Sequence, residues 1–259
     1  MQALIEEPKK SKKSNLKKID KKINTLTKII YRGVGRAIAD YNLIENNDKI
    51  LVAVSGGKDS LSLLKILQMR QSFAPVKYDI LAVHINMGYP CQQPKILESF
   101  FKENDINYYI EKLNILKPGQ TRKDITCFWC SWNRRKAIFE LAGKFGCNKV
   151  ALGHHKDDIT ETILLNMFFQ GEISAMAPRQ ELFQGKITII RPFAYVEEKI
   201  LEQFATRCNF PIPHCTCPNA KTSKRTLMKK IIKNLEKDIK DVKNNIFQSL
   251  KRIKTDYLL

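Results

Sequence analysis

A short run of glycine, serine and charged residues, SGGKDS at positions 55–60, directly follows the apolar residues 51–54. Its two adjacent glycines, Gly56 and Gly57, let the backbone approach an anion closely. A helix that begins near Ser60 would direct its free N–H groups back toward this turn. The pattern therefore predicts a strand, a turn and a helix that together could hold pyrophosphate.

The side chains of this loop suit phosphate chemistry. Lys58 can neutralise phosphate, and Ser55 and Ser60 can donate hydrogen bonds to it. Asp59 can hold a magnesium ion or orient a nucleophile. The loop is not a Walker loop, because Val52 stands where the first glycine of that motif belongs and Asp59 stands where its Ser or Thr belongs. It is not a G-x-G-x-x-G dinucleotide fingerprint either.

Four of the seven cysteines form two pairs. Cys127 and Cys130 make a Cys-x-x-Cys motif, and Cys215 and Cys217 lie in a proline-rich stretch, FPIPHCTCPN. Four thiolates, two from each pair, would suit zinc. Three thiolates would suit an iron–sulfur cluster with one iron left open, and the spacing does not choose between the two. The other cysteines are interpreted as ordinary buried thiols: Cys91, Cys147 and Cys208.

The elements that must position these residues alternate between strand and helix. Short apolar runs rich in β-formers are separated by stretches with helical character, which predicts a parallel sheet with helices on both faces. Ligands bind such sheets at the carboxyl ends of the strands, where the loop at 55–60 lies. The strands are expected at residues 50–54, 80–85, 106–110, 149–152 and 187–190, and the helices at 61–69, 94–103, 133–145 and 157–169.

The formal net charge of +19 is concentrated at the two ends of the chain. Residues 1–33 hold ten Lys/Arg against three acids, and residues 221–254 hold twelve against three. Both ends also repeat apolar residues at steps of three and four, which is typical of amphipathic helices. Lysine-rich helices on either side of a balanced core indicate a polyanion such as nucleic acid, although lysine is also the default solvated residue.

The composition places the chain among globular proteins. With 259 residues and 43% hydrophobic content it can bury a core. We find no apolar run of signal-peptide or membrane-span length, so we expect a soluble cytoplasmic protein without a disulfide framework. The expected division is a basic helical extension at 1–48, a nucleotide-binding domain carrying the cysteine site at 49–220, and a basic helix at 221–259.

At this point the sequence resembles a known family. SGGKDS after an apolar strand resembles the PP-loop ATP pyrophosphatases, which cleave ATP between the α and β phosphates and activate a carbonyl oxygen as its adenylate. Within them the chain is most similar to the tRNA 2-thiocytidine synthetases. Three segments carry this likeness: GRAIADYNLIENNDKILVAVSGGKDS, TCFWCSWNRRKAIFELAGKFGCNKVALGHHKDDITETILLNMFFQG and IIRPFAYVEEKILEQFA.

The resemblance implies a PP-loop fold, ATP with magnesium, and a 4Fe-4S cluster held by three cysteines. It implies Cys127, Cys130 and Cys215 as the cluster ligands. The family has Pro-Cys-x-x-Cys where this chain has His214-Cys215-Thr216-Cys217, so Cys217 is the alternative third ligand.

Further roles in the nucleotide site are implied for three segments. In GHHKDD, Gly153 would permit close approach to the nucleotide, and Asp157 or Asp158 would bind magnesium, although either could instead cap a helix. Arg134, beside Arg135, would hold tRNA phosphate or stabilise the adenylate, unless it makes an ordinary surface salt bridge. With Lys58 and Asp59 it is expected to act in catalysis. Two residues that end the second strand could contact adenine through their backbone: His84 and Asn86.

The expected reaction is thiolation of an anticodon-loop cytidine in tRNA, with release of AMP and pyrophosphate. Single-stranded loop bases are the accessible targets in RNA. A sulfur donor such as a cysteine desulfurase is implied as a partner, and a homodimer is considered. Two alternatives remain: a tRNA uridine thiolase or desulfidase of the same superfamily, and a zinc-bound tRNA-binding protein with an inactive nucleotide site.

Overall fold

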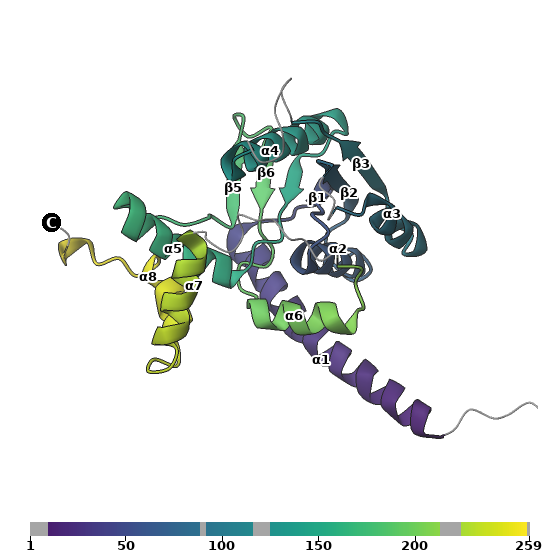
Figure 1. Ribbon diagram of the computed structural model, residues 1–259, viewed down its shortest axis with the longest axis horizontal. Helices are drawn as coiled ribbons and strands as arrows, with labels where there is room; N and C mark the ends of the chain where they lie inside the picture. Colours follow the sequence, from purple (N-terminus) through teal and green to yellow (C-terminus); the bar gives the residue numbers. More distant parts are fainter. Residues whose placement is uncertain (1–9, 89–91, 116–124, 213–223, 258–259) are drawn as a thin grey trace, which may run out of the picture.

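The computed structural model describes residues 10–88, 92–115, 125–212 and 224–257, with the backbone alone described at 10–22 and 127. Its centre is one six-stranded sheet with the strand order β3-β2-β1-β4-β6-β5 (Figure 1). The strands are β1 (Asp48–Ala53), β2 (Tyr78–Asn86), β3 (Tyr108–Lys112), β4 (Lys149–Ala151), β5 (Arg179–Leu182) and β6 (Ile187–Ile190).

Four of the five strand pairings are parallel, as the alternation of strands and helices predicts. The central strands are apolar because both faces of the sheet are covered, and Ile50, Leu51 and Val52 of β1 are fully buried. The predicted parallel sheet has one antiparallel edge, where β5 pairs with β6. A tight turn joins them, in which Phe183 and Gly185 have positive φ angles of 53° and 83°.

Helices cover both faces of the sheet (Figure 1). The buried side chains of α4 pack on one face, and those of α1, α2, α3 and α6 gather in the core of the other. The apolar stripes of these helices supply that packing, as in other layered α/β folds. The helices are α1 (Lys10–Tyr41), α2 (Lys58–Arg70), α3 (Pro94–Glu103), α4 (Cys127–Lys144), α5 (Lys156–Gln170), α6 (Glu198–Arg207), α7 (Lys224–Leu235) and α8 (Val242–Ser249).

The second half of α1 is part of the core. Leu26, Ile30, Val34 and Ala37 are buried at steps of four, four and three. Gly33 allows the close approach of this helix to the segment before α6, because a Cβ there would lie 2.9 Å from Cγ2 of Val196. The basic N-terminal end is therefore anchored through its apolar stripe.

The C-terminal stretch, which the periodicity predicts as one helix, forms two. The backbone N–H of Val242 bonds to the carbonyl of Ile239 in a turn, and α8 begins after Asp241. Both α7 and α8 pack on α5, and Met228, Ile232 and Val242 form a small cluster with Leu164. The break lets two apolar faces contact α5. None of the described helices is both long enough and apolar enough to cross a lipid bilayer.

Candidate active site

The loop at 55–60 has the geometry of an anion-binding turn. Gly56 has a φ of +90°, which favours glycine, and Gly57 precedes α2 without any side chain capping the helix. The Oγ of Ser60 donates to the carbonyl oxygen of Gly57 at 2.9 Å, and the N–H of Gly57 donates to Oγ of Ser55 at 3.3 Å. α2 begins at Lys58, two residues earlier than expected. Its first-turn N–H groups thus lie within the loop itself.

A cavity of about 370 Å³ lies beside this loop, at the carboxyl ends of β1, β2 and β4. It brings together residues from three segments that sequence reasoning assigned to the site. Gly56, Gly57 and Lys58 are not among the residues that line it. The expected residues that do line it are Ser55, Asp59, Ser60, Arg134, Gly153 and Asp158.

Gly153 lies in the loop between β4 and α5, and its lack of a side chain lets this loop approach the loop at 55–60 closely. A Cβ at this position would lie 3.1 Å from the carbonyl carbon of Asp59 and 3.1 Å from the backbone nitrogen of Ser60. These neighbours are backbone atoms at the start of α2 and cannot rotate away. The close approach expected of Gly153 is therefore made to the phosphate loop.

Lys58, which is expected to neutralise phosphate, is paired with two carboxylates. Its Nζ lies 3.0 Å from both carboxylate oxygens of Asp59 and 3.1 Å from Oε1 of Glu198. Burial opposes the charge of Lys58, but the two carboxylates outweigh it and raise its pKa. Burial likewise opposes the charge of Glu198, yet Lys229 and Lys58 lower its pKa to about 2. Glu198 is thus a partner of the loop at 55–60 that sequence reasoning missed.

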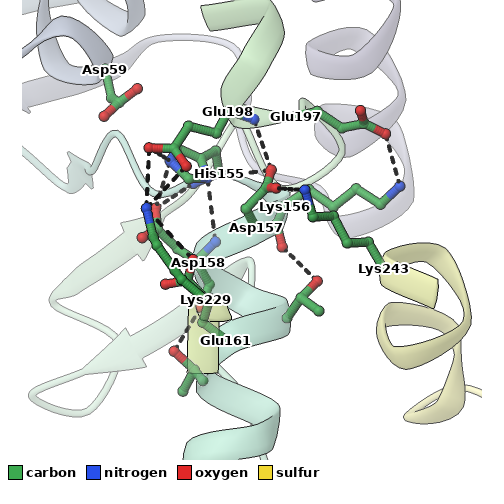
Figure 2. A network of polar contacts seen from close by, with 12 residues as sticks. Asp59, His155, Lys156, Asp157, Asp158, Glu161, Glu197, Glu198, Lys229 and Lys243 are labelled. Atoms are coloured by element: carbon green, nitrogen blue, oxygen red, sulfur yellow. Dashed lines mark hydrogen bonds and ion pairs between the residues drawn. The ribbon is translucent and has the colours of Figure 1, made fainter. Parts of the chain in front are cut away.

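The start of α5 distinguishes the two neighbouring aspartates (Figure 2). Oδ2 of Asp157 accepts from the N–H of Glu198 at 2.7 Å, and Oδ1 lies 2.9 Å from Nζ of Lys243. Asp158 forms a capping box with His155 and lines the cavity. Both aspartates have both carboxylate oxygens engaged, since Asp158 accepts from the N–H of His155 at 3.0 Å and from Arg225 at 3.3 Å, but of the two only Asp158 lines the cavity.

Two basic residues of α7 contact carboxylates of α5 and α6. Arg225 lies 3.3 Å from Asp158 and 3.5 Å from Glu161, and Lys229 lies 3.0 Å from Glu198. Glu161 is 2% exposed, and burial raises its pKa to about 7 in spite of Lys229 and Arg225. Part of the C-terminal positive charge is therefore used in ion pairs within the protein, a use that neither the predicted polyanion surface nor the alternative of solvated lysines includes.

The opposite wall of the cavity carries arginines. Arg134 and Arg135 are exposed, line the cavity and have no ion pair with any described residue, so the salt bridge considered for them is not found there. Arg191 follows β6 and is buried; it donates to Nδ1 of His154 at 3.4 Å and to the carbonyl of Ala177. Burial and the charge of Arg135 lower the pKa of Arg191 to about 10.

Arg191 was missed by sequence reasoning, although its position directly after the strand predicted at 187–190 was an available signal. Burial of the neighbouring His154 and the charge of Arg191 lower the pKa of His154 to about 4. No described carboxylate lies within ion-pair distance of Arg191. This wall is therefore strongly electropositive and suits an anionic ligand.

The cysteines expected as metal ligands are only partly described. Cys127 and Cys130 lie one turn apart at the start of α4, and the side chain of Cys127 lies outside the described residues, as do Cys215 and Cys217. Cys130 is half-buried, and its Sγ lies 3.8 Å from Sδ of Met87. A half-buried thiol next to Ser131, which lines the cavity, fits a soft metal or cluster beside the nucleotide site.

The remaining expectations concern side chains away from the cavity. Cys147 is buried and Cys208 is half-buried, and burial raises the pKa of both thiols; Cys91 lies outside the described residues. His84 is fully buried, with Nδ1 2.8 Å from the carbonyl oxygen of Val54, and burial lowers its pKa. Its side chain thus ties the ends of β1 and β2 together.

Comparison with known proteins agrees with this geometry. A family model described as a PP-loop domain matches residues 23–212. The chain is 42% identical to the tRNA-cytidine(32) 2-sulfurtransferase of Geobacter metallireducens, over 89% of this chain and 91% of that protein. It is also 42% identical to the protein of the same name from Geobacter sulfurreducens, over 91% and 94%.

Among solved structures, the chain is similar to the U34-tRNA thiolase NcsA from Methanococcus maripaludis with its 4Fe-4S cluster. The TM-score is 0.73 at 22% identity, and the match covers 89% of this chain and 79% of that one. This likeness shows a shared fold. With the family match over residues 23–212 and the two relatives at 42% identity, it leads to one conclusion: the chain belongs to the PP-loop family and, within it, to the tRNA-cytidine(32) 2-sulfurtransferases.

Proposed function

We propose that this protein is an ATP-dependent tRNA sulfurtransferase that replaces the C2 oxygen of an anticodon-loop cytidine by sulfur. The observation that carries the proposal is the cavity at the carboxyl ends of β1, β2 and β4. It joins the phosphate loop to the start of α4, where the Cys-x-x-Cys motif lies. The relatives' name specifies cytidine 32, and we extend that position to this chain.

The first half-reaction activates the base. The C2 carbonyl oxygen of the cytidine attacks the α phosphorus of ATP, and the bond to the β phosphate breaks to release pyrophosphate. The loop at 55–60 would hold the pyrophosphate, with Lys58 neutralising its charge and the N–H groups at the start of α2 donating to it. Arg134 would stabilise the charge that develops on the adenylate.

Magnesium would be held by Asp59 and Asp158. Both carboxylates line the cavity, and oxygen ligands together with phosphate are the ligands that magnesium prefers. Asp157 is less suited because it does not line the cavity and its carboxylate bonds to the N–H of Glu198 and to Lys243. Reaction in the absence of any divalent cation would contradict this assignment.

In the second half-reaction, sulfur at the oxidation level of sulfide attacks C2, the bond from C2 to the adenylate oxygen breaks, and AMP leaves with the original oxygen. A donor such as a cysteine desulfurase would deliver sulfur as a persulfide, which a thiol reductant would first have to reduce to that level. We propose Cys127, Cys130 and Cys215 as the ligands of a 4Fe-4S cluster, which would supply a soft site for that sulfur. The position of Cys130 beside the cavity supports this choice. The protein would act in the cytoplasm, and a homodimer stays a proposal.

Cysteine variants test the ligand set. Anaerobically purified protein should be brown and contain iron and acid-labile sulfide. Cys127→Ala, Cys130→Ala and Cys215→Ala should each lose this absorbance, while Cys217→Ala keeps it. Loss with all four variants would indicate a fully coordinated metal and contradict the proposal, and colourless protein with bound zinc would favour the RNA-binding alternative.

The function itself is tested by mass spectrometry of tRNA nucleosides. A strain that lacks this gene should lose 2-thiocytidine and regain it with the wild-type gene. Purified protein with ATP and a sulfur source should form AMP and pyrophosphate in proportion to thiolated tRNA. Loss of a thiolated uridine with 2-thiocytidine retained would instead support the uridine thiolase.

A further inference from the structure

Large aromatic side chains are exposed at the start of α4. Phe128 is 75% exposed and Trp132 is 46% exposed. Both lie within one turn of Cys130, near the electropositive wall of the cavity. Exposed aromatic surface of this size beside a functional site is typical of a binding surface.

The tryptophan is held in place before any ligand binds. Its ring stacks on that of Trp129, with centroids 5.6 Å apart and an interplanar angle of 15°. Trp129 is half-buried against the core under α4, and its Nε1 donates to the carbonyl oxygen of Ile115 at 3.2 Å. Trp132 is therefore a preorganised surface, and ordering it on binding costs little conformational entropy.

The helix carries this aromatic surface to the mouth of the cavity. Phe128, Ser131, Trp132 and Arg135 occupy positions i, i+3, i+4 and i+7, which lie on one face of a helix. Ser131 and Arg135 line the cavity. The two exposed aromatic residues thus lie on the same face of α4 as two residues that line the cavity.

We propose that Phe128 and Trp132 form a stacking platform for the unpaired bases next to the target cytidine in the RNA loop. The inference rests on the proposed function, since it assumes an RNA substrate whose cytidine enters the cavity. A base can enter only if it leaves the stack of its neighbours, and those neighbours then expose their faces. Aromatic side chains replace the lost stacking without demanding a particular base.

The charges around the platform favour RNA over a protein partner. Arg134 and Arg135 have no carboxylate partner in the described residues, and guanidinium groups bind phosphate with two hydrogen bonds. Nζ of Lys136 lies 5.7 Å from the centre of the Trp132 ring, at the same surface. Aromatic rings among cations match the alternation of bases and phosphates in a single strand.

The test measures binding of an anticodon stem-loop RNA to the full-length protein in the absence of ATP. Phe128→Ala and Trp132→Ala should each weaken binding by roughly 5- to 150-fold, the range expected for loss of one stacked base. Trp132→Phe should keep most of the affinity. The affinity for ATP and the melting temperature should not change, because both side chains are exposed.

Phe73→Ala is the matched control. Phe73 is 55% exposed and carries a neighbouring cation, Arg70, but it lies beyond the far end of α2. Its loss should leave RNA affinity unchanged. A second probe has an abasic nucleotide next to the cytidine. It should bind the wild-type protein more weakly, and Trp132→Ala should add little further loss.

The outcomes separate this inference from the proposed function. Unchanged RNA affinity in both alanine variants, or no binding of the stem-loop by the wild-type protein, would overturn the platform. Unchanged RNA affinity with a raised KM for a desulfurase, but not for inorganic sulfide, would show that a protein donor docks there instead. Loss of stem-loop affinity in a protein that thiolates no cytidine would support the platform and refute the proposed function.

Discussion

Two groups of residues around the cavity, here called the paired wall and the unpaired wall, use positive charge in opposite ways. In the paired wall, on the side of α5, α6 and α7, cations have carboxylate partners: Lys58 and Lys229 with Glu198, and Lys243 with Asp157. Figure 2 shows the contacts of Lys229 and Lys243. In the unpaired wall, on the side of α4, Arg134 and Arg135 line the cavity and have no carboxylate partner among the described residues. Buried Arg191 adds positive charge near Arg135, and its partners among the described residues are a histidine and a carbonyl.

This difference separates structural from functional charge. A cation that is already paired with a buried or half-buried carboxylate is costly to release, because its partner is left as an uncompensated charge. A cation without such a partner keeps its full field for a ligand. Lys58 belongs to both groups, since it is paired by Glu198 and yet lies in the phosphate loop. ATP binding would therefore have to draw Lys58 from a carboxylate toward a phosphate.

The largest effect is expected at the phosphate loop. Lys58→Ala and Asp59→Asn should each lower the rate of AMP formation by at least about 10²-fold, because each removes a group aimed at the reacting phosphates. Circular dichroism should show a folded protein. Full thiolation by either variant would contradict the role of the loop, and would place Lys58 wholly on the structural side of the comparison.

A smaller effect is expected at the unpaired wall. Arg134→Gln and Arg135→Gln should each weaken tRNA binding or slow thiolation by roughly 10- to 100-fold, the loss of about one charged hydrogen bond. The melting temperature should stay the same. Gel-shift titration and single-turnover kinetics measure both properties.

Lys243→Gln is the matched control from the paired wall. It leaves Asp157 without its cation, so it should lower the melting temperature while tRNA affinity stays near that of the wild type. If instead the arginine variants lose stability and the Lys243 variant loses RNA affinity, the distinction between the walls is wrong.

A pH effect is expected from Glu161 in the paired wall. Burial raises the pKa of Glu161 in the folded state to about 7, above the ordinary glutamate value of 4.5, so the folded state binds the proton more tightly than the unfolded state. The stability due to this group is present below pH 4.5 and is lost as the pH rises to about 7. The free energy of unfolding of Glu161→Gln should rise relative to that of the wild type between pH 4.5 and about pH 7. Above about pH 7 the difference between the two proteins should be constant.

The stability of Glu161→Gln must be compared with that of the wild type at each pH, because the titration of His154 changes stability in the opposite direction. Its pKa is lowered to about 4, so its contribution is lost as the pH falls from about 6.5. Urea titrations between pH 4 and pH 8 measure both proteins. A pH-independent difference would mean that Arg225 and Lys229 keep Glu161 ionised.

The smallest effect concerns the N-terminal charge. Deletion of residues 1–22 removes eight lysines and three acids but spares the buried stripe of α1 that begins at Leu26. If these lysines contact tRNA, the slope of log affinity against log salt should become shallower by about 0.7 to 0.9 per lost phosphate contact. An unchanged slope would mean that these lysines are solvated and do not contact tRNA.

Sequence reasoning succeeded where the signal is local. The strands at 50–54 and 80–85, the helix at 94–103 and the loop at 55–60 each carry their own apolar or glycine pattern, and each lies at or within a few residues of the place expected. β5 was missed because RQEL has no apolar run and its pairing depends on β6. An edge strand needs only one neighbour, so it leaves little trace in the sequence.

The site was predictable only in part for the same reason. Asp59, Gly153 and Asp158 follow strand ends and could be placed at one edge of the sheet. The ion pair between Lys58 and Glu198 joins residues 140 positions apart, and nothing near either residue indicates its partner. The inward orientation of Arg225 likewise depends on how α7 packs on α5.

The missing side chain of Gly153 sets the spacing between two loops of the site. A Cβ at this position would lie 3.1 Å from backbone atoms at the start of α2, which is closer than an ordinary van der Waals contact. A side chain at position 153 would therefore push the first turn of α2 away from the β4–α5 loop and displace the N–H groups that lie in the phosphate loop. The shape of the anion-binding turn thus depends on an atom that residue 153 lacks.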